Sequence, residues 1–126
     1  MIVADASAYV AFLLGESPAT AGHHLNGDVA APDLIFAEIA SGLARAVRQG
    51  AISGEQAAFL LDEALAAPIR TTPLHEIVAR AFELRANLSV YDACYVALAE
   101  LLECGVVTAD RRLANSPGLP VPVTLV

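Results

Sequence analysis

Short apolar segments alternate with longer helical patterns along this chain, and that alternation restricts the possible folds more than any other feature. Strands separated by helices predict crossover connections and a mostly parallel sheet with helices on both faces. We therefore expect an α/β fold in three α/β/α layers, as a single domain over residues 1–126, because this length suits one compact core. The expected strands are Ile2 to Ala4, Val29 to Ala31, Ile69 to Thr71, Val106 to Thr108 and Val121 to Leu125.

The helical patterns between these strands begin at recognisable capping signals. Ser53 followed by Gln56, and Ser89 followed by Asp92, each fit a capping box. Hydrophobic periodicity places the remaining boundaries. The expected helices cover Ser7 to Leu14, Pro18 to Leu25, Leu34 to Gln49, Glu55 to Ala66, Glu76 to Ala86 and Tyr91 to Glu103, with a last turn near Arg111.

Charge and hydropathy limit the classes of function. The net charge is −7, from 14 acids against seven bases, so the basic footprint of many nucleic-acid-binding proteins is absent from the totals. No segment has the ~18 uninterrupted apolar residues of a membrane span, and the first residues lack the basic region of a secretory signal. We therefore expect a cytoplasmic protein with no membrane contact. Cys94 and Cys104 lie in an apolar helical stretch and are expected to be reduced thiols.

Two aspartates follow expected strands. Asp5 comes directly after the first strand, and Asp110 follows the strand that ends at Thr108. Ligands bind outside the carboxyl ends of parallel strands, so both carboxylates should project at the same edge of the sheet. Each has a structural alternative, because Asp110 fits the N-cap of the turn that follows and Asp5 could cap the next helix. For that helix, however, Ser7 is the better-placed cap, which would leave Asp5 without a structural role.

Two further acids lie near helix starts. Glu38 lies opposite the expected core-facing side of its helix, where a solvated surface glutamate is the simpler interpretation. Asp92 begins the most apolar helix of the chain and could simply stabilise its first turn, although Ser89 already supplies a cap. The expected core-facing stripe of the Glu38 helix consists of Phe36, Ala40, Leu43 and Val47.

Gathered at one edge, these acids would form a metal site. Each pair of carboxylates repels by about 4 kcal/mol at 4 Å with an effective dielectric near 20. Without a cation, some of them would have to take up protons. Oxygen-only ligands suit Mg²⁺ or Mn²⁺, and one or two such ions can activate a water and stabilise a phosphodiester during displacement.

Four segments carry a resemblance to a known family. They read IVADASA at the N-terminus, APDLIFAEIASGLARA around Glu38, LSVYDACYVALAE around Asp92 and GVVTADRRLA around Asp110. In order and spacing the chain resembles PIN-domain ribonucleases, and within them the small VapC-type toxins of toxin–antitoxin pairs. The resemblance implies that the four acidic positions of the family fall on Asp5, Glu38, Asp92 and Asp110. Ser7 and Thr108 would then stand at its hydroxyl positions near the metal.

The resemblance also implies an activity and partners. It implies an endoribonuclease that depends on Mg²⁺ or Mn²⁺ and stops translation by cutting RNA, with tRNA or rRNA as the typical targets. Asp5 would be the most central ligand, next to Asp92, with Glu38 and Asp110 completing the site. A homodimer is implied, as is a cognate VapB-type antitoxin whose C-terminal tail occupies the active-site groove.

Two arginines are candidates for contacting RNA phosphates. Arg45 lies seven residues after Glu38, within about 20° of it around the helix and roughly 10 Å along the axis. Arg112 follows Asp110, and for Arg112 a plain surface arginine is the simpler interpretation. A dimer surface is expected on the Glu55 to Ala66 helix, where Phe59, Leu60 and Leu61 offer more apolar area than one core needs.

Other classes remain to be compared. Haloacid dehalogenase-like phosphatases need a second carboxylate two residues after the first, where this chain has Ser7, and both they and receiver domains need a lysine, which the chain lacks. A PIN fold without catalysis, serving as an RNA- or protein-binding module, would be marked by loss of an acid, and all four are present. A PIN-type nuclease outside a toxin–antitoxin pair is the remaining alternative.

Overall fold

Five parallel strands form one central sheet. The computed structural model describes the backbone of residues 1–126 and every side chain except those of residues 19 and 20. The strands lie in the order β3-β2-β1-β4-β5, so the chain moves outward on one side of β1 and then crosses to the other side. The strands are β1 Ile2–Ala4, β2 Val29–Pro32, β3 Ile69–Thr72, β4 Val106–Thr108 and β5 Val123–Leu125.

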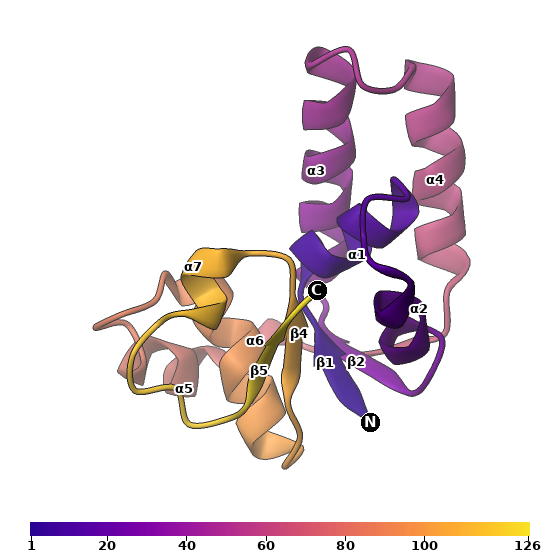
Figure 1. Cartoon of the computed structure of the whole chain (residues 1–126). Helices are drawn as coiled ribbons and strands as arrows, with labels where there is room; N and C mark the ends of the chain where they lie inside the picture. The colour runs from indigo at the N-terminus through magenta and orange to yellow at the C-terminus, as the bar shows by residue number, and fades with distance from the viewer.

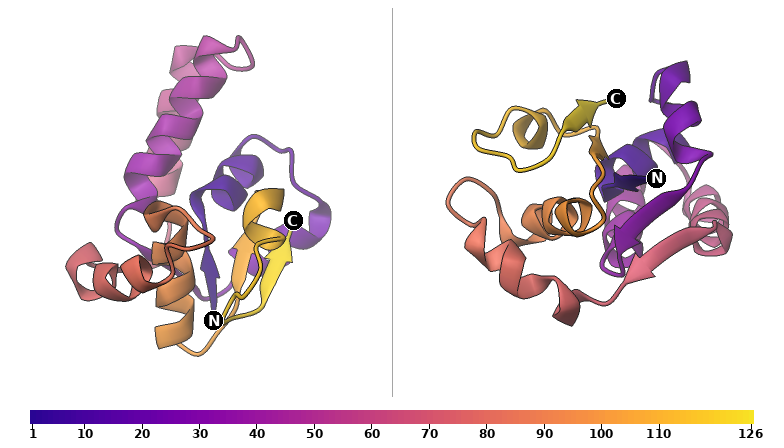
Figure 2. Two further views of the ribbon diagram at one scale, coloured as in Figure 1. Left: turned by 90° about the vertical axis from the view of Figure 1, so that its left-hand side faces the viewer. Right: turned by 90° about the horizontal axis from the view of Figure 1, so that it is seen from below.

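Helices connect successive strands and cover both faces of the sheet, as the alternating pattern predicts (Figure 2). The helix α6 packs against β1, β2 and β4, and α5 packs on α6. On the other face α1 packs against β4, whereas α7 lies on the same side of the sheet as α6 and packs against β4 and β5 (Figure 2). The helices are α1 Ala6–Leu13, α2 Ala19–Leu25, α3 Ile35–Arg48, α4 Gly54–Ala66, the 3₁₀ turn η1 Leu74–Glu76, α5 Val78–Glu83, α6 Val90–Leu101 and α7 Arg111–Ala114.

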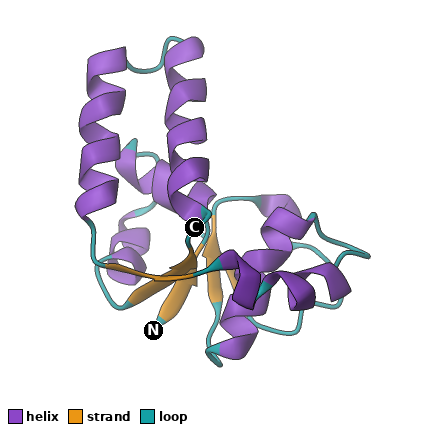
Figure 3. Cartoon of the chain, turned by 180° about the vertical axis from the view of Figure 1, so that it is seen from behind, coloured by secondary structure: helices purple, strands orange, loops and turns teal.

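The helices α3 and α4 form an antiparallel pair that extends beyond the carboxyl ends of the strands (Figures 1 and 3). Gly50, with a φ of 75°, follows α3, and the capping box of Ser53 and Gln56 begins α4 as expected from the sequence. The base of α3 packs against α1. This arrangement leaves a long helical arm beside the edge of the sheet where Asp5 and Asp110 lie.

The core-facing side of α3 differs from the expectation. The buried residues are Ile35, Ile39, Leu43 and Ala46, whereas Phe36, Ala40 and Val47 are only half-buried. Glu38 therefore lies at the margin of the buried face, and the prediction that it points away from the core was wrong. The expected buried stripe assumed that the large ring of Phe36 faces the core. In the structure the branched side chains of Ile35 and Ile39 fill the core instead, so the buried face of α3 is rotated from the expected one.

The segment from Glu76 to Ala86 is not the single helix that the sequence predicts. It divides into η1 and α5, joined at Ile77, whose backbone dihedrals of −123° and −14° are not helical. Ile77 is only 2% exposed, so the chain bends there to bury that side chain. The last strand also begins at Val123, two residues later than expected. None of the helices in the described structure has the length and hydropathy of a membrane crossing.

Candidate active site

The register of the two central strands brings Asp5 beside Thr108. Val3 pairs with Val106 and Ala4 with Val107. The backbone N–H of Asp5 continues this ladder by donating to the carbonyl of Val107 at 3.1 Å. β1 and β4 are also the strands between which the chain order reverses, and such a switch point is where open α/β sheets bind ligands.

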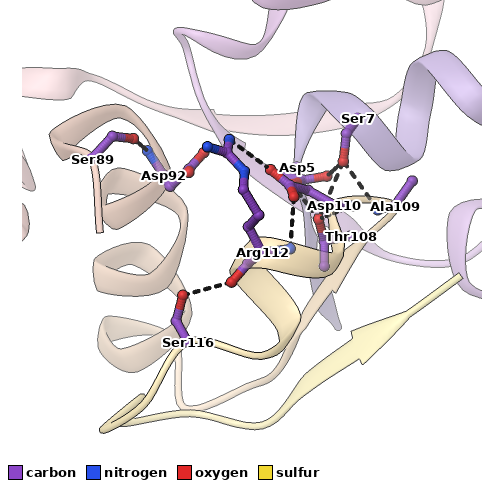
Figure 4. Close-up of polar contacts among 9 residues, drawn as sticks. All are labelled: Asp5, Ser7, Ser89, Asp92, Thr108, Ala109, Asp110, Arg112 and Ser116. Atoms are coloured by element: carbon purple, nitrogen blue, oxygen red, sulfur yellow. Dashed lines mark hydrogen bonds and ion pairs between the residues drawn. The ribbon is translucent and has the colours of Figure 1, made fainter. Parts of the chain in front are cut away.

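A cage of donors surrounds the Asp5 carboxylate, which is 4% exposed (Figure 4). Its Oδ1 accepts hydrogen bonds from the Ser7 hydroxyl at 2.7 Å and the Ala8 N–H at 2.9 Å. Its Oδ2 accepts one from the fully buried hydroxyl of Thr108 at 2.5 Å. The bond from Ala8 makes Asp5 the N-cap of α1. The expectation that Ser7 caps this helix was therefore wrong, because Ser7 lies inside the first turn and its hydroxyl turns back to Asp5.

The two hydroxyls tie Asp5 to the loop that follows β4. The Ser7 oxygen accepts from the Ala109 N–H at 3.0 Å, and the Thr108 oxygen accepts from the Asp110 N–H at the same distance. Both hydroxyls thus bond the carboxylate and the neighbouring backbone, which fixes their orientation. Even so, burial raises the pKa of Asp5 above its usual value, because these hydrogen bonds only partly offset the lost hydration and Asp92 adds repulsion.

Glu38 reaches the same region from the first turn of α3. Its Oε1 accepts a hydrogen bond from the hydroxyl of Tyr95 at 2.6 Å. Burial raises the pKa of Glu38, the Tyr95 hydrogen bond lowers it, and the charges of Asp92 and Asp5 raise it further. Glu38 therefore lies within electrostatic reach of two other candidate acids.

Asp92 lies in the first turn of α6, where the Ser89 hydroxyl accepts from its N–H at 3.1 Å and caps the helix. The Asp92 carboxylate does not accept from the Ser89 N–H in return, so the expected capping box is only half formed. Burial raises the pKa of Asp92 most, and the charge of Asp110 raises it further, whereas the nearby Ser89 hydroxyl and the charge of Arg112 lower it. The guanidinium of Arg112 lies between Asp92 and Asp110 (Figure 4). Asp92 and Asp110 thus lie on opposite sides of the Arg112 guanidinium.

Asp110 has a structural role as well. Its Oδ1 accepts from the Arg112 N–H at 2.8 Å, which makes it the N-cap of α7, and its Oδ2 pairs with the Arg112 guanidinium at 3.3 Å. The side chain of Arg112 is 88% exposed, so this ion pair contributes little to stability. The position of Asp110 therefore fits both interpretations from the sequence, as the N-cap of α7 and as a candidate acid of the site.

A match to a known family covers most of the chain. The family model described as PIN domain matches residues 2–119. The chain belongs to the PIN-domain family. Its α/β fold with a five-stranded parallel sheet agrees with this assignment.

Curated relatives of this PIN domain are ribonucleases by name. Ribonuclease VapC9 of Mycobacterium tuberculosis is 42% identical, with 100% of this chain and 98% of the relative covered. Ribonuclease VapC12 of the same organism is 38% identical, with 100% and 99% covered. The resemblance expected from the four sequence segments is confirmed, and the chain is a homologue of VapC ribonucleases over its whole length.

Solved structures agree on the fold. The crystal structure of PAE2754 from Pyrobaculum aerophilum has a TM-score of 0.66 and 26% identity, covering 90% of this chain and 82% of the other. The structure of VapBC2 from Rickettsia felis, bound to a DNA fragment from its promoter, has a TM-score of 0.61, with 98% of each chain covered. At 15% identity the second likeness concerns the fold alone.

The donor chemistry of this PIN domain fits a hard divalent cation. The candidate groups are carboxylates with hydroxyls behind them, which are oxygen ligands of the kind that Mg²⁺ and Mn²⁺ prefer. Burial without a full counter-charge raises the pKa of Asp5, and a bound cation would offset that cost. As oriented, however, the described side chains contain no group of three or more His, Cys, Asp or Glu residues that could hold one ion. Glu38 is turned to Tyr95 and Asp110 to Arg112.

A cleft of about 440 Å³ opens beside the acids of the PIN domain. Ser7, Glu38 and Ala109 line it at the acidic end. Arg45 lines it further along α3, as its seven-residue spacing from Glu38 predicts. Arg112 does not line the cleft and instead lies at the acids themselves.

One side chain of the candidate site, that of Tyr95, was not expected from the sequence. Tyr95 was treated as part of a helix segment without polar groups, yet its hydroxyl is the partner of Glu38. Its spacing of three residues from Asp92 places the two on the same side of α6. Because a buried tyrosine hydroxyl needs a hydrogen-bond partner, that spacing was the available signal.

Proposed function

We propose that this PIN domain is a metal-dependent endoribonuclease of the VapC toxin type. The observation that carries the proposal is the pairwise proximity of four acids near the switch point of a parallel sheet. The charge of Asp92 acts on Asp5 and Glu38, that of Asp5 acts on Glu38, and that of Asp110 acts on Asp92. Full-length homology with proteins named as ribonucleases supports the same reaction class.

Each of the four acids has a proposed role in binding the metal. Asp5, buried and held by Ser7 and Thr108, is the proposed central ligand, and Asp92 is proposed to bind beside it. Glu38 and Asp110 complete the site directly or through water, which requires Asp110 to exchange its contact with Arg112. A bound Mg²⁺ or Mn²⁺ would supply an activated water and stabilise charge on the scissile phosphodiester.

The cleft along α3 is the proposed path of the RNA strand. It begins at Ser7 and Glu38, and Arg45 is the positive side chain among its lining residues. A phosphate next to the scissile one would lie within reach of that guanidinium, which is the preferred side chain for phosphate contacts. Arg112 is proposed to contact RNA once the cation takes over the charges of Asp92 and Asp110. We propose a tRNA or a ribosomal RNA as the substrate and arrest of translation as the outcome.

Two protein partners belong to the proposal. One is a VapB-type antitoxin whose C-terminal tail fills the cleft, which predicts that the antitoxin complex does not cut RNA and that removing the antitoxin restores cleavage. The other is a second copy of the chain. Of the apolar residues expected at this surface, Phe59 is 64% exposed, whereas Leu60 and Leu61 are half-buried against the core, and Leu65, 55% exposed, adds apolar surface that was not expected. The dimer stays a prediction that sedimentation mass would test.

Cleavage of total RNA by the purified protein tests the proposed activity. We expect discrete fragments with Mg²⁺ or Mn²⁺ and none with EDTA. Asp5→Asn, which keeps an oxygen for the N-cap, should abolish cleavage, whereas Asp62→Asn on the exposed face of α4 should not change it. Fragments that persist in EDTA or in Asp5→Asn would refute the metal mechanism. Absence of fragments under every condition would favour the non-catalytic binding module.

A further inference from the structure

We infer that Tyr95 is a positioning residue, whose hydroxyl holds Oε1 of Glu38 so that Oε2 stays available to a divalent cation. The inference rests on the proposed metal site and concerns a residue outside the four acids. It assigns a role in metal binding to a side chain that would otherwise count only as filling the core.

The contact has the properties of a strong hydrogen bond. The hydroxyl of Tyr95 donates to Oε1 of Glu38 across 2.6 Å, within the roughly 2.5–2.7 Å range of O–H···O⁻ bonds. Tyr95 is 1% exposed and Glu38 is half-buried, so water competes weakly for either group. Burial and the hydrogen bond to Glu38 both raise the pKa of Tyr95, so the hydroxyl remains a donor across the neutral range.

Tyr95 also stands where three acid-bearing segments meet. It follows Asp92 by three residues on α6, its hydroxyl donates to Glu38 on α3, and the backbone of Ala6, next to Asp5, is close enough to that hydroxyl to lower its pKa. The hydroxyl of Tyr95 therefore lies close to all three segments that carry the acids, α6, α3 and the start of α1. The ring is locked by the core around it, so it cannot follow Glu38 if that side chain turns away.

The bond opposes a repulsion that would otherwise displace Glu38. The charges of Asp92 and Asp5 both disfavour the Glu38 carboxylate, and a half-buried glutamate can relieve this by rotating toward solvent. The hydroxyl of Tyr95 holds Glu38 against that rotation before any cation arrives. A ligand oriented in advance loses less side-chain entropy on binding, and removing such partners typically weakens metal affinity about 10- to 100-fold.

Mn²⁺ affinity in the absence of RNA tests the inference. Tyr95→Phe keeps the ring and deletes only the hydroxyl, and we expect its Mn²⁺ dissociation constant, measured by electron paramagnetic resonance, to rise about 10-fold. Tyr91→Phe makes the same change on the same helix at a position that is 64% exposed, and it should match the wild type. Melting curves in EDTA verify that both variants are folded.

A double variant separates positioning from packing. If Tyr95 acts through the Glu38 carboxylate, adding Tyr95→Phe to Glu38→Ala should weaken Mn²⁺ binding less than twofold further. An equal 10-fold loss in both backgrounds, or an unchanged affinity in Tyr95→Phe, would overturn the inference while leaving the wild-type nuclease intact. A wild type that neither binds Mn²⁺ nor cuts RNA would instead overturn the proposed function, and this inference with it.

Discussion

Asp5 combines two roles that the sequence suggested were separate. It caps α1 through Ala8, and it is also the most buried of the four acids, held by Ser7 and Thr108. A capping residue needs only to accept one hydrogen bond, so burial of a carboxylate is not required for the cap alone. The cost of that burial, visible as a raised pKa, is consistent with a site kept for a cation.

The metal-free protein should lose stability as pH rises. The pKa values of Asp5, Glu38 and Asp92 are raised in the folded state, so their stabilising contribution is present below the ordinary carboxyl range and is lost as pH rises through the raised values. Melting temperatures in EDTA, from about pH 4 to pH 8, would measure this loss. Asp5→Asn removes one of the charges, and we expect it to become more stable than the wild type toward neutral pH. A wild type that is the more stable of the two at neutral pH without metal would contradict the account.

At the scale of elements, the site depends on how closely α3 approaches α1. Gly42 lies at this contact, where an added Cβ atom would come within 2.9 Å of Cγ2 of Val10. Gly42 is one turn from Glu38 along α3, so any displacement of the helix would move that carboxylate relative to Asp5. The absence of a side chain at position 42 thus contributes to the site from outside it.

Gly42→Leu should therefore weaken both folding and metal binding. Overpacking typically costs about 1–3 kcal/mol, which the better helix propensity of leucine would only partly offset. Urea unfolding would measure the stability, and Mn²⁺ titration would measure the affinity. Gly54→Ala is the matched control, because its Cβ would meet no atom within 4 Å, and it should leave both quantities near the wild type. Unchanged Mn²⁺ affinity in Gly42→Leu would refute the link between this contact and the site.

The sequence predicted the strands better than the orientation of the helices. Apolar runs bounded by polar punctuation located every strand within about two residues. The phase of α3 was wrong because Phe36 and Ile35 are both apolar neighbours, and hydropathy alone does not decide which of them faces the sheet. Likewise, periodicity could not reveal the bend at Ile77, which depends on burying that side chain in the assembled core.

The candidate site was predictable in its members and less so in its contacts. Asp5 and Asp110 follow from strand ends in a parallel sheet, whereas the resemblance to PIN domains was needed for Glu38. The cap at Asp5 and the bond from Tyr95 depend on side-chain directions that only the packed structure defines. The pairing of Asp110 with Arg112 was likewise not evident from their proximity in sequence.

At the scale of the whole molecule, the proposed function requires an acidic protein to bind a polyanion. The net charge is −7, so the protein as a whole repels the RNA phosphates. The proposed RNA binding must therefore rely on local positive side chains and bound cations. Arg45 lines the cleft beside the acids, whereas Arg48, also exposed and one turn further along α3, does not. The cleft therefore offers a positive contact at one defined place.

Arg45→Gln should weaken RNA binding with little effect on the chemical step. We expect KM to rise about 3- to 10-fold with kcat nearly unchanged, because one phosphate contact is lost, and the dependence of KM on salt should become shallower. Steady-state cleavage at several salt concentrations would measure both effects. Arg48→Gln is the control and should behave as the wild type. Equal effects of the two substitutions would mean that net charge, and not the cleft, governs binding.

The most direct test of the central claim is to locate a metal in crystals grown with Mn²⁺. Anomalous diffraction at the manganese edge identifies the ion without assumptions about its ligands. The account predicts a peak at about 2.0–2.3 Å from carboxylate oxygens of Asp5 and Asp92, with Glu38 and Asp110 bound directly or through water. A protein that takes up Mn²⁺ only elsewhere, or shows no peak at saturating concentration, would contradict the proposal that this sheet edge is a metal-dependent nuclease site.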